Sequence, residues 1–223
     1  MVVTFEKHVA NTKIRARAFQ TLFDGKPGLI YPFHLFTDED DPYFIDVFVY
    51  SLEVEDISEP IVAAVTNGMS DYPMRDVESG KTVRRELIQY FHECDEDHAE
   101  RLYEMAWLPL FDKFALDRYQ TIAWPDAQAA GSPLNNGFFL PPMWDAHSDF
   151  EMDIDDDPVT LLWHVPISHE ELAEKKKNGA NSLIERMEEV ELPWIFDEKN
   201  RPSLLKSANA SSTGAKLKRN PER

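Results

Sequence analysis

The sequence predicts a protein of the α+β class, in which strands and helices follow one another in mixed order. Apolar residues at helical spacing over 4–23, and again from about Asp95, bracket a strand-rich stretch between residues 29 and 91. Later, an alternating segment and an apolar run precede a helix-capping motif. With 43% hydrophobic residues among 223, the chain can bury a sizeable core.

The first predicted helix covers residues 4–23 and ends at Asp24-Gly25. Its apolar residues recur at helical spacing, so we expect them to face the core. They are Phe5, Val9, Ile14 or Ala16, Phe19 and Phe23.

Strands are predicted next, from runs of β-branched and aromatic residues. They cover residues 29–36, 43–52, 61–66 and 83–91. A second helix begins near Asp95 and is broken or kinked at Pro109. Short strands are expected at 119–124 and 137–140.

The segment DAHSDFEMDIDDD, residues 145–157, places an acidic residue or a histidine at every second position. Its second half alternates as a strand does, Asp155-Asp156-Asp157-Pro158 is a turn signal, and VTLLWHVPI follows, so we predict a β-hairpin. Ser168 and Glu171 then form a predicted capping box, and Asn178-Gly179 interrupts the helix that it starts.

Charge is unevenly distributed along the chain. The last eighteen residues carry five Lys or Arg and one Glu, a net +4, so residues 1–205 carry −22 where the whole chain carries −18. Such a body repels nucleic acid and anionic membranes, and it favours a basic protein or peptide as partner. We predict a single domain over 1–205 and a disordered basic tail over 206–223.

The predicted location is the cytoplasm. Cys94 is the only cysteine, so no internal disulfide can form, and the N-terminus MVVTFEKHVANTK does not have the pattern of a signal peptide.

The acidic row allows three interpretations. A calcium loop of the EF-hand type fails because Phe150 stands where glycine is needed, and carboxylates alternating along a strand do not converge on one ion. A solvated or gatekeeping strand face is the plainest interpretation, and a surface for a partner is the next. A divalent-metal-dependent hydrolase using Asp145, His147 and Asp149 remains the alternative function.

Two other segments suggest chemistry without supplying a complete motif. FHECDEDH holds His92, Cys94 and His98 but no second pair at zinc spacing, and His164 reads best as a core histidine. The loop TNGMSDYPM matches neither a nucleophile elbow nor a P-loop. Its Met69, Tyr72 and Met74 either form a protein-binding surface or pack back onto the core.

The residues therefore indicate an acidic, mixed α and β domain without a recognisable active site, and we expect no catalysis, no cofactor and no metal. The candidate partner contacts are Met69, Tyr72, Met74, Trp144, Asp145, His147, Asp149 and Glu151.

Several segments together resemble the Suppressor of fused domain family, over roughly residues 25–200. They are VTNGMSDYPM (65–74), RRELIQYF (84–91), SPLNNGFFLPP (132–142) and VTLLWHVPISHEELAEKKKNGANSLIERME (159–188). The resemblance implies a central mixed, largely antiparallel sheet flanked by helices, and no known catalysis.

The resemblance also implies a function. The family's animal member binds and restrains a transcription factor in Hedgehog signalling and has a second, C-terminal domain that this chain is too short to hold. The acidic residues by which that protein binds its target peptide correspond to Gln120 and Pro142 in this sequence. We therefore do not transfer that mode of peptide binding to this chain. Family members that consist of this domain alone, as this chain does, look bacterial. Some of them are proposed to be immunity proteins that neutralise toxins.

Overall fold

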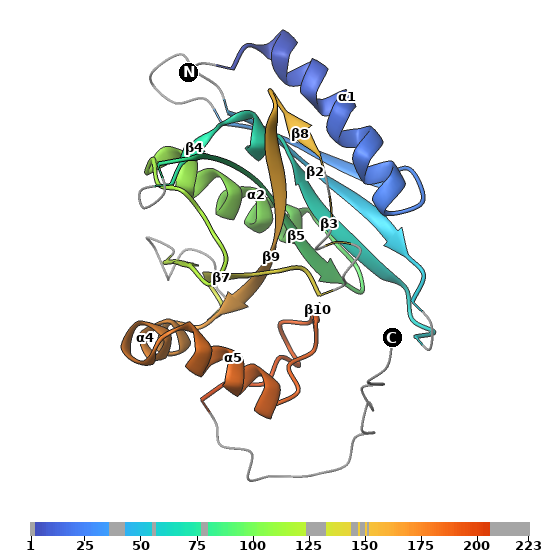
Figure 1. The fold of residues 1–223 in the computed structure, drawn as a ribbon. Coiled ribbons are helices and arrows are strands. Elements are labelled where there is room, and N and C mark those ends of the chain that lie inside the picture. Colours follow the sequence, from blue (N-terminus) through green and yellow to red (C-terminus); the bar gives the residue numbers. More distant parts are fainter. Residues whose placement is uncertain are drawn as a thin grey trace, which may run out of the picture.

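A ten-stranded mixed sheet organises the chain, in a computed structural model that describes residues 3–35, 43–54, 57–76, 80–123, 133–143, 147, 150 and 152–205. Its main path runs β1-β2-β3-β5-β9-β7-β6, and β4, β8 and β10 pair with strands of this path (Figure 1). Neighbours are antiparallel except for β5 with β9 and β5 with β10. The predicted mixed, largely antiparallel sheet is confirmed.

The predicted strands lie close to their expected places, and the short strands β4 and β10 were not predicted. Their bounds are β1 Leu29–Leu35, β2 Tyr43–Leu52, β3 Ile61–Asn67, β4 Met74–Arg75, β5 Thr82–Phe91, β6 Thr121–Ile122, β7 Asn136–Leu140, β8 Asp153–Ile154, β9 Asp157–Ile167 and β10 Ile195–Phe196.

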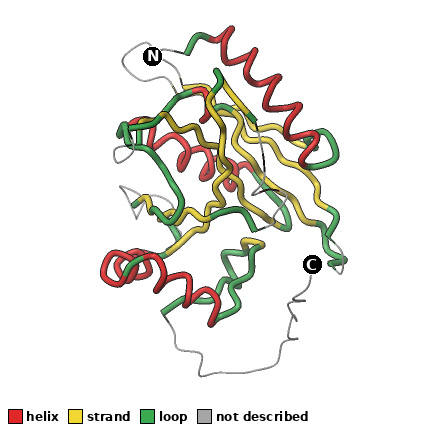
Figure 2. Tube along the Cα trace, viewed as in Figure 1, coloured by secondary structure: helices red, strands yellow, loops and turns green. Residues whose placement is uncertain are grey.

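Four α-helices flank the sheet within the described residues: α1 Phe5–Leu22, α2 Glu96–Phe111, α4 His169–Asn178 and α5 Ala180–Glu189 (Figure 2). A short 3-10 helix, η1 Met69–Asp71, follows β3. Both bonds of the predicted capping box are present at Ser168 and Glu171, and Gly179 separates α4 from α5 as expected. None of the described helices is long and apolar enough to cross a membrane.

The core has two layers, one on each face of the sheet, because side chains alternate along each strand. Ile45, Val47 and Val49 of β2 pack toward α2, whereas Phe48 and Tyr50 join the other layer. That second layer also contains Phe19 and residues of α4 and α5, so α1, α4 and α5 contribute to the face opposite α2.

The predicted apolar face of the first helix is wrong in its first half. Phe5, Val9 and Ile14 are 60%, 36% and 45% exposed, while Phe19 and Phe23 are buried as expected. The side of α1 that faces the protein carries His8, Asn11 and Arg15 together with Phe19. Polar side chains are buried there because the segment beneath them presents carboxylates.

Candidate protein-interaction surface

The loop after β3 is hydrogen-bonded to one buried carboxylate of β5, that of Glu86. Glu86 Oε1 accepts from the backbone N–H groups of Gly68 and Ser70, at 3.1 and 3.0 Å, and from the Ser70 hydroxyl at 2.7 Å. Its Oε2 accepts from the Thr66 hydroxyl at 2.6 Å. Burial raises the pKa of Glu86, and these donors and nearby Arg15 act against that rise. The loop is therefore tied to β5 by hydrogen bonds shielded from water.

A second buried carboxylate joins the same loop to α1. Asp71 accepts from Arg15 through Nη1 and Nη2, at 2.6 and 2.9 Å, and from Asn11 at 2.6 Å. The His8 ring contacts it at 2.8 Å, and Arg15 Nε also donates to Asn67. Burial alone would raise the pKa of Asp71, but the hydrogen bonds from His8, Arg15 and Asn11 outweigh burial and lower it. Asp71 therefore stays ionised and paired.

This anchoring decides where the predicted contacts of the loop lie. Met69 and Met74 are buried in the layer beside α2, and Tyr72 is half-buried with its hydroxyl accepting from the Phe44 backbone N–H at 3.0 Å. Of the two interpretations of these residues, packing onto the core is the one found, and an exposed Met69 or Met74 is ruled out in this conformation. Adaptable thioethers fill the space between sheet and helix instead.

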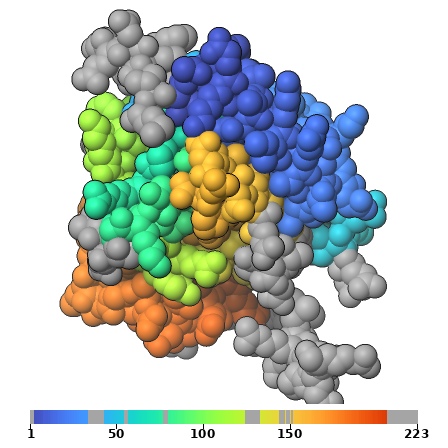
Figure 3. Space-filling view, turned by 45° about the horizontal axis from the view of Figure 1, so that its top comes forward, coloured from blue at the N-terminus to red at the C-terminus, as the bar shows by residue number. Residues whose placement is uncertain are grey.

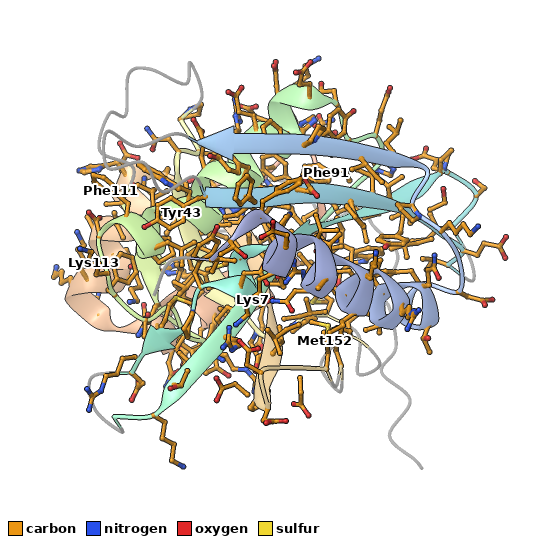
Figure 4. All side chains as sticks on the ribbon, turned by 90° about the horizontal axis from the view of Figure 1, so that it is seen from above. Lys7, Tyr43, Phe91, Phe111, Lys113 and Met152 are labelled. Carbon is orange, nitrogen blue, oxygen red and sulfur yellow. The ribbon has the colours of Figure 1, made fainter. Side chains whose placement is uncertain are left out.

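Tyr72 and Met74 nevertheless border a surface pocket of about 340 Å³. Its remaining wall comes from the start of β2, from Arg75 and from the C-terminal end of α2. Tyr43 and Lys113, which line it, lie on the same side of the molecule as the exposed Phe111 (Figure 4). Direct contact with a partner at this loop would therefore pass through Tyr72 and this pocket.

The predicted hairpin is present, with a shorter first strand than expected. Asp155 and Asp156 form its turn with φ of 54° and 64°, and Asp153 faces outward while Met152 and Ile154 are buried. Figure 3 shows the hairpin at the surface, beside α1. The carboxylates of this segment are thus on the solvent side, as the alternation predicts.

Half of these hairpin carboxylates are neutralised by the protein's own cations. Asp155 Oδ2 accepts from Lys7 at 2.6 Å and from Arg84 at 3.1 Å, and Asp157 accepts from Arg84 at 3.1 Å. The ammonium of Lys7 lowers the pKa of Asp155. Asp153 and Asp156 form no ion pair within the described part of the chain. They are the hairpin carboxylates that a basic partner could reach without competition.

His147 is buried, whereas a solvent-exposed row of side chains over residues 145–157 would leave it accessible. Its Nδ1 lies 2.7 Å from the Tyr90 hydroxyl, and burial lowers its pKa to about 4. Trp144, Asp145, Asp149 and Glu151 lie outside the described residues, so their roles stay predictions. The hydrolase alternative needs Asp145 and Asp149 beside His147, and because these two residues lie outside the described part of the chain, their arrangement stays a prediction.

Of the other residues considered for chemistry, Cys94 and His164 occupy core positions, whereas His92 is 44% exposed. Cys94 is buried, and burial raises the pKa of its thiol to about 12. His164 is buried with Nδ1 at 2.8 Å from Gln89 Oε1, and burial lowers its pKa to about 3. The prediction of a core histidine holds.

Sequence reasoning missed the network around Arg15, Asp71 and Glu86. One signal was present: RRE in the middle of a strand between apolar residues is unusual, because charges rarely enter a central strand unpaired. The pairing of Glu86 with a loop 16 to 20 residues earlier could not be read from the sequence.

Comparison with known proteins agrees with this architecture. The family model described as Suppressor of fused protein matches residues 41–202. No curated protein matches the chain.

Three solved structures have the same fold at low sequence identity. A Suppressor of fused homolog from Neisseria gonorrhoeae has a TM-score of 0.61 at 16% identity, covering 90% of this chain and 100% of that one. The Sufu–Fu complex gives 0.60 at 13% identity, covering 87% and 92%. Drosophila Suppressor of Fused gives 0.62 at 12% identity, covering 87% of this chain and 51% of that one.

Proposed function

Because the chain belongs to the Suppressor of fused protein family, we propose that it is a protein-binding domain without catalytic activity, which sequesters a basic protein partner. The family match over residues 41–202 carries the protein-binding part. One solved structure with this fold is the Sufu–Fu complex, which also supports a protein-binding role for this chain.

The sign of the partner's charge follows from the chain's own charge. Residues 1–205 carry −22, and the hairpin presents Asp153 and Asp156 in solvent next to carboxylates already paired with Lys7 and Arg84. A surface of this kind attracts a basic protein over long range and raises its association rate more than its affinity.

The partner that we propose is a basic protein toxin, which this chain would neutralise in the manner of an immunity protein. The support is the expectation from the family resemblance, together with a likeness to the homolog from Neisseria gonorrhoeae that covers 100% of the solved chain of that protein. Neutralisation by binding needs no active site, which fits the core positions of Cys94, His147 and His164.

Affinity capture with the full chain from its native cell tests the proposal. We expect a basic protein to be retained at low salt and released at high salt, to bind the purified chain with defined stoichiometry, and to be inactivated in the complex. A specific partner that is acidic, or conversion of a small-molecule substrate by the purified chain, would contradict it.

A further inference from the structure

Strands β5 and β9 run together and then separate, which opens the sheet at one end. They pair in parallel from Arg84 with Val159 to Ile88 with Trp163. Beyond that point β9 continues to Ile167 beside β7, while β5 pairs with β10 at Tyr90 and Phe91. Figure 1 shows β10 at this end of the sheet, near α5.

A pocket of about 200 Å³ lies at this separation. Residues of β9 from Trp163 to Pro166 form one wall, and residues 192–197 form the other, with His92, Asn200 and Arg201 completing the lining. Pockets for drug-sized ligands hold about 300–1,000 Å³. This one is smaller and suits a single inserted side chain.

Two indole rings in the pocket lining are held in place by the core. Trp163 and Trp194 both belong to the layer that contains α4 and α5. Tyr90 lies between them in the packing, edge-on to Trp194 at 5.3 Å and tilted against Trp163 at 6.4 Å between ring centroids. Because these rings are already packed, little side-chain entropy is lost when a ligand binds against them.

One carboxylate at the pocket keeps its negative charge uncompensated. Asp197 accepts from the backbone N–H groups of Lys199 and Asn200 and from the Asn200 side chain, at 3.0, 3.3 and 2.7 Å. The Asn200 hydrogen bond lowers the pKa of Asp197, so the group is ionised. All three donors are neutral amides, and Asp197 forms no ion pair with another described residue.

Among the described residues that line the pocket there is one arginine, and its charge is paired. Arg201 Nη1 donates to Glu171 Oε1 at 2.7 Å, and both side chains are buried. Glu171 also accepts from the backbone N–H of Leu204 and caps α4. The pair is therefore fixed. His92, which also lines the pocket and is positive only when protonated, lies 3.6 Å from Glu59, so Asp197 is the lining carboxylate that forms no ion pair among the described residues.

From aromatic walls and a net negative charge, we propose that this pocket binds a lysine or arginine side chain of the partner. The cation would lie against the indole of Trp163 or Trp194 and pair with the Asp197 carboxylate. An acidic side chain is disfavoured by Asp197, and an apolar side chain would leave that carboxylate desolvated without compensation. The inference rests on the proposed function and names its contact point.

Short peptides test the pocket before any partner is known. The probes are tetra-arginine, tetra-glutamate and a Gly-Ser tetrapeptide, each added to the full chain while the indole N–H signals of its five tryptophans are followed by NMR. We expect tetra-arginine to shift the Trp163 and Trp194 signals and the other two peptides to leave them unchanged. Shifts spread evenly over all the tryptophans, or none at these two, would contradict the pocket.

Variants of the pocket then separate this inference from the proposed function. Asp197→Asn keeps an oxygen for the turn and removes the charge, and it should weaken binding of tetra-arginine and of the captured partner by about tenfold. Trp194→Leu should do the same, Trp194→Phe should restore part of the loss, and Glu185→Gln on the exposed surface of α5 should bind as the parent does. A basic partner that binds the parent and all four variants equally would overturn the pocket and leave the proposed function standing. No basic partner at all would overturn both.

Discussion

Arg15 of α1 and Asp71 of η1 form a buried, bidentate ion pair, in which Nη1 lies 2.6 Å from Oδ1 and Nη2 lies 2.9 Å from Oδ2. Both side chains are fully buried, and the pair links the first helix to the loop that follows β3. Through Ser70 the same loop is bonded to Glu86 of β5. The position of α1 on the sheet therefore depends on charges as well as on apolar contact.

Removing one partner of this pair should cost more than any surface change on the helix. Arg15→Met leaves Asp71 buried without its cation, and we expect the free energy of unfolding to fall by about 3–5 kcal/mol. Arg17→Met, two residues away on the exposed side of α1, is the matched control and should change it by less than about 0.5 kcal/mol. Urea unfolding of both variants measures this, and equal stability of the two would contradict the role of the pair.

Gly68 should not accept a side chain. Its φ is 144°, and an added Cβ would collide with the backbone of Phe44 and Ile45. We expect Gly68→Ala to lower the free energy of unfolding by at least about 2 kcal/mol. Gly25→Ala, where the nearest atom is 3.9 Å from the added carbon, should be nearly neutral. Thermal unfolding of the two variants decides, and a stable Gly68→Ala protein would show that the loop is not fixed as described.

Stability should decline on mild acidification, in part because of His164. Burial lowers its pKa from 6.5 in the unfolded chain to about 3 in the fold. Below pH 6.5 the unfolded chain binds a proton there that the folded chain does not, so stability falls as the pH falls toward 4. The contribution of one such group is at most about 1.4 kcal/mol per pH unit.

The variant His164→Gln isolates this effect from that of other titrating groups. Unfolding free energies measured from pH 7.5 to 4.5 should fall less steeply in His164→Gln than in the parent. A parallel pair of curves for His164→Gln and the parent would contradict the buried, neutral histidine.

Lys7 should limit the attraction for a basic partner while adding little stability. It pairs with Asp155 at the surface, where such pairs contribute about 0–1 kcal/mol. Lys7→Met should therefore leave the unfolding curve almost unchanged and increase the association rate constant for a basic partner at low salt. Stopped-flow or surface-based kinetics measures that rate, and an unchanged association rate constant would show that the hairpin lies outside the encounter surface.

The elements were largely predictable because local patterns determined them. Alternation and the turn at Asp155-Asp156 predicted the hairpin, and both turn residues adopt the positive φ that a tight two-residue connection requires. Ser168 with Glu171 predicted the start of α4 in the same way. In each case the residues that form the feature are neighbours in sequence.

The burial of side chains was harder to predict wherever it depends on distant segments. The prediction that Phe5, Val9 and Ile14 of α1 face the core was wrong. The helix instead turns its polar side toward the protein, because Asp71 and Glu86, which are far away in sequence, pair with Arg15 there. Arg84 neutralises Asp155 and Asp157 from more than 70 residues away, which no local pattern reveals. The pocket between Trp163 and Trp194 likewise exists only after β5 and β9 separate.

The salt dependence of association with the captured partner tests the central claim most directly. The parent and Asp153→Asn/Asp156→Asn would be compared from low to high ionic strength. If the acidic face attracts a basic protein, the parent's association rate constant should fall steeply with salt, and the variant's should start lower and fall less steeply. A rate constant that is independent of salt, and identical in parent and variant, would contradict the account.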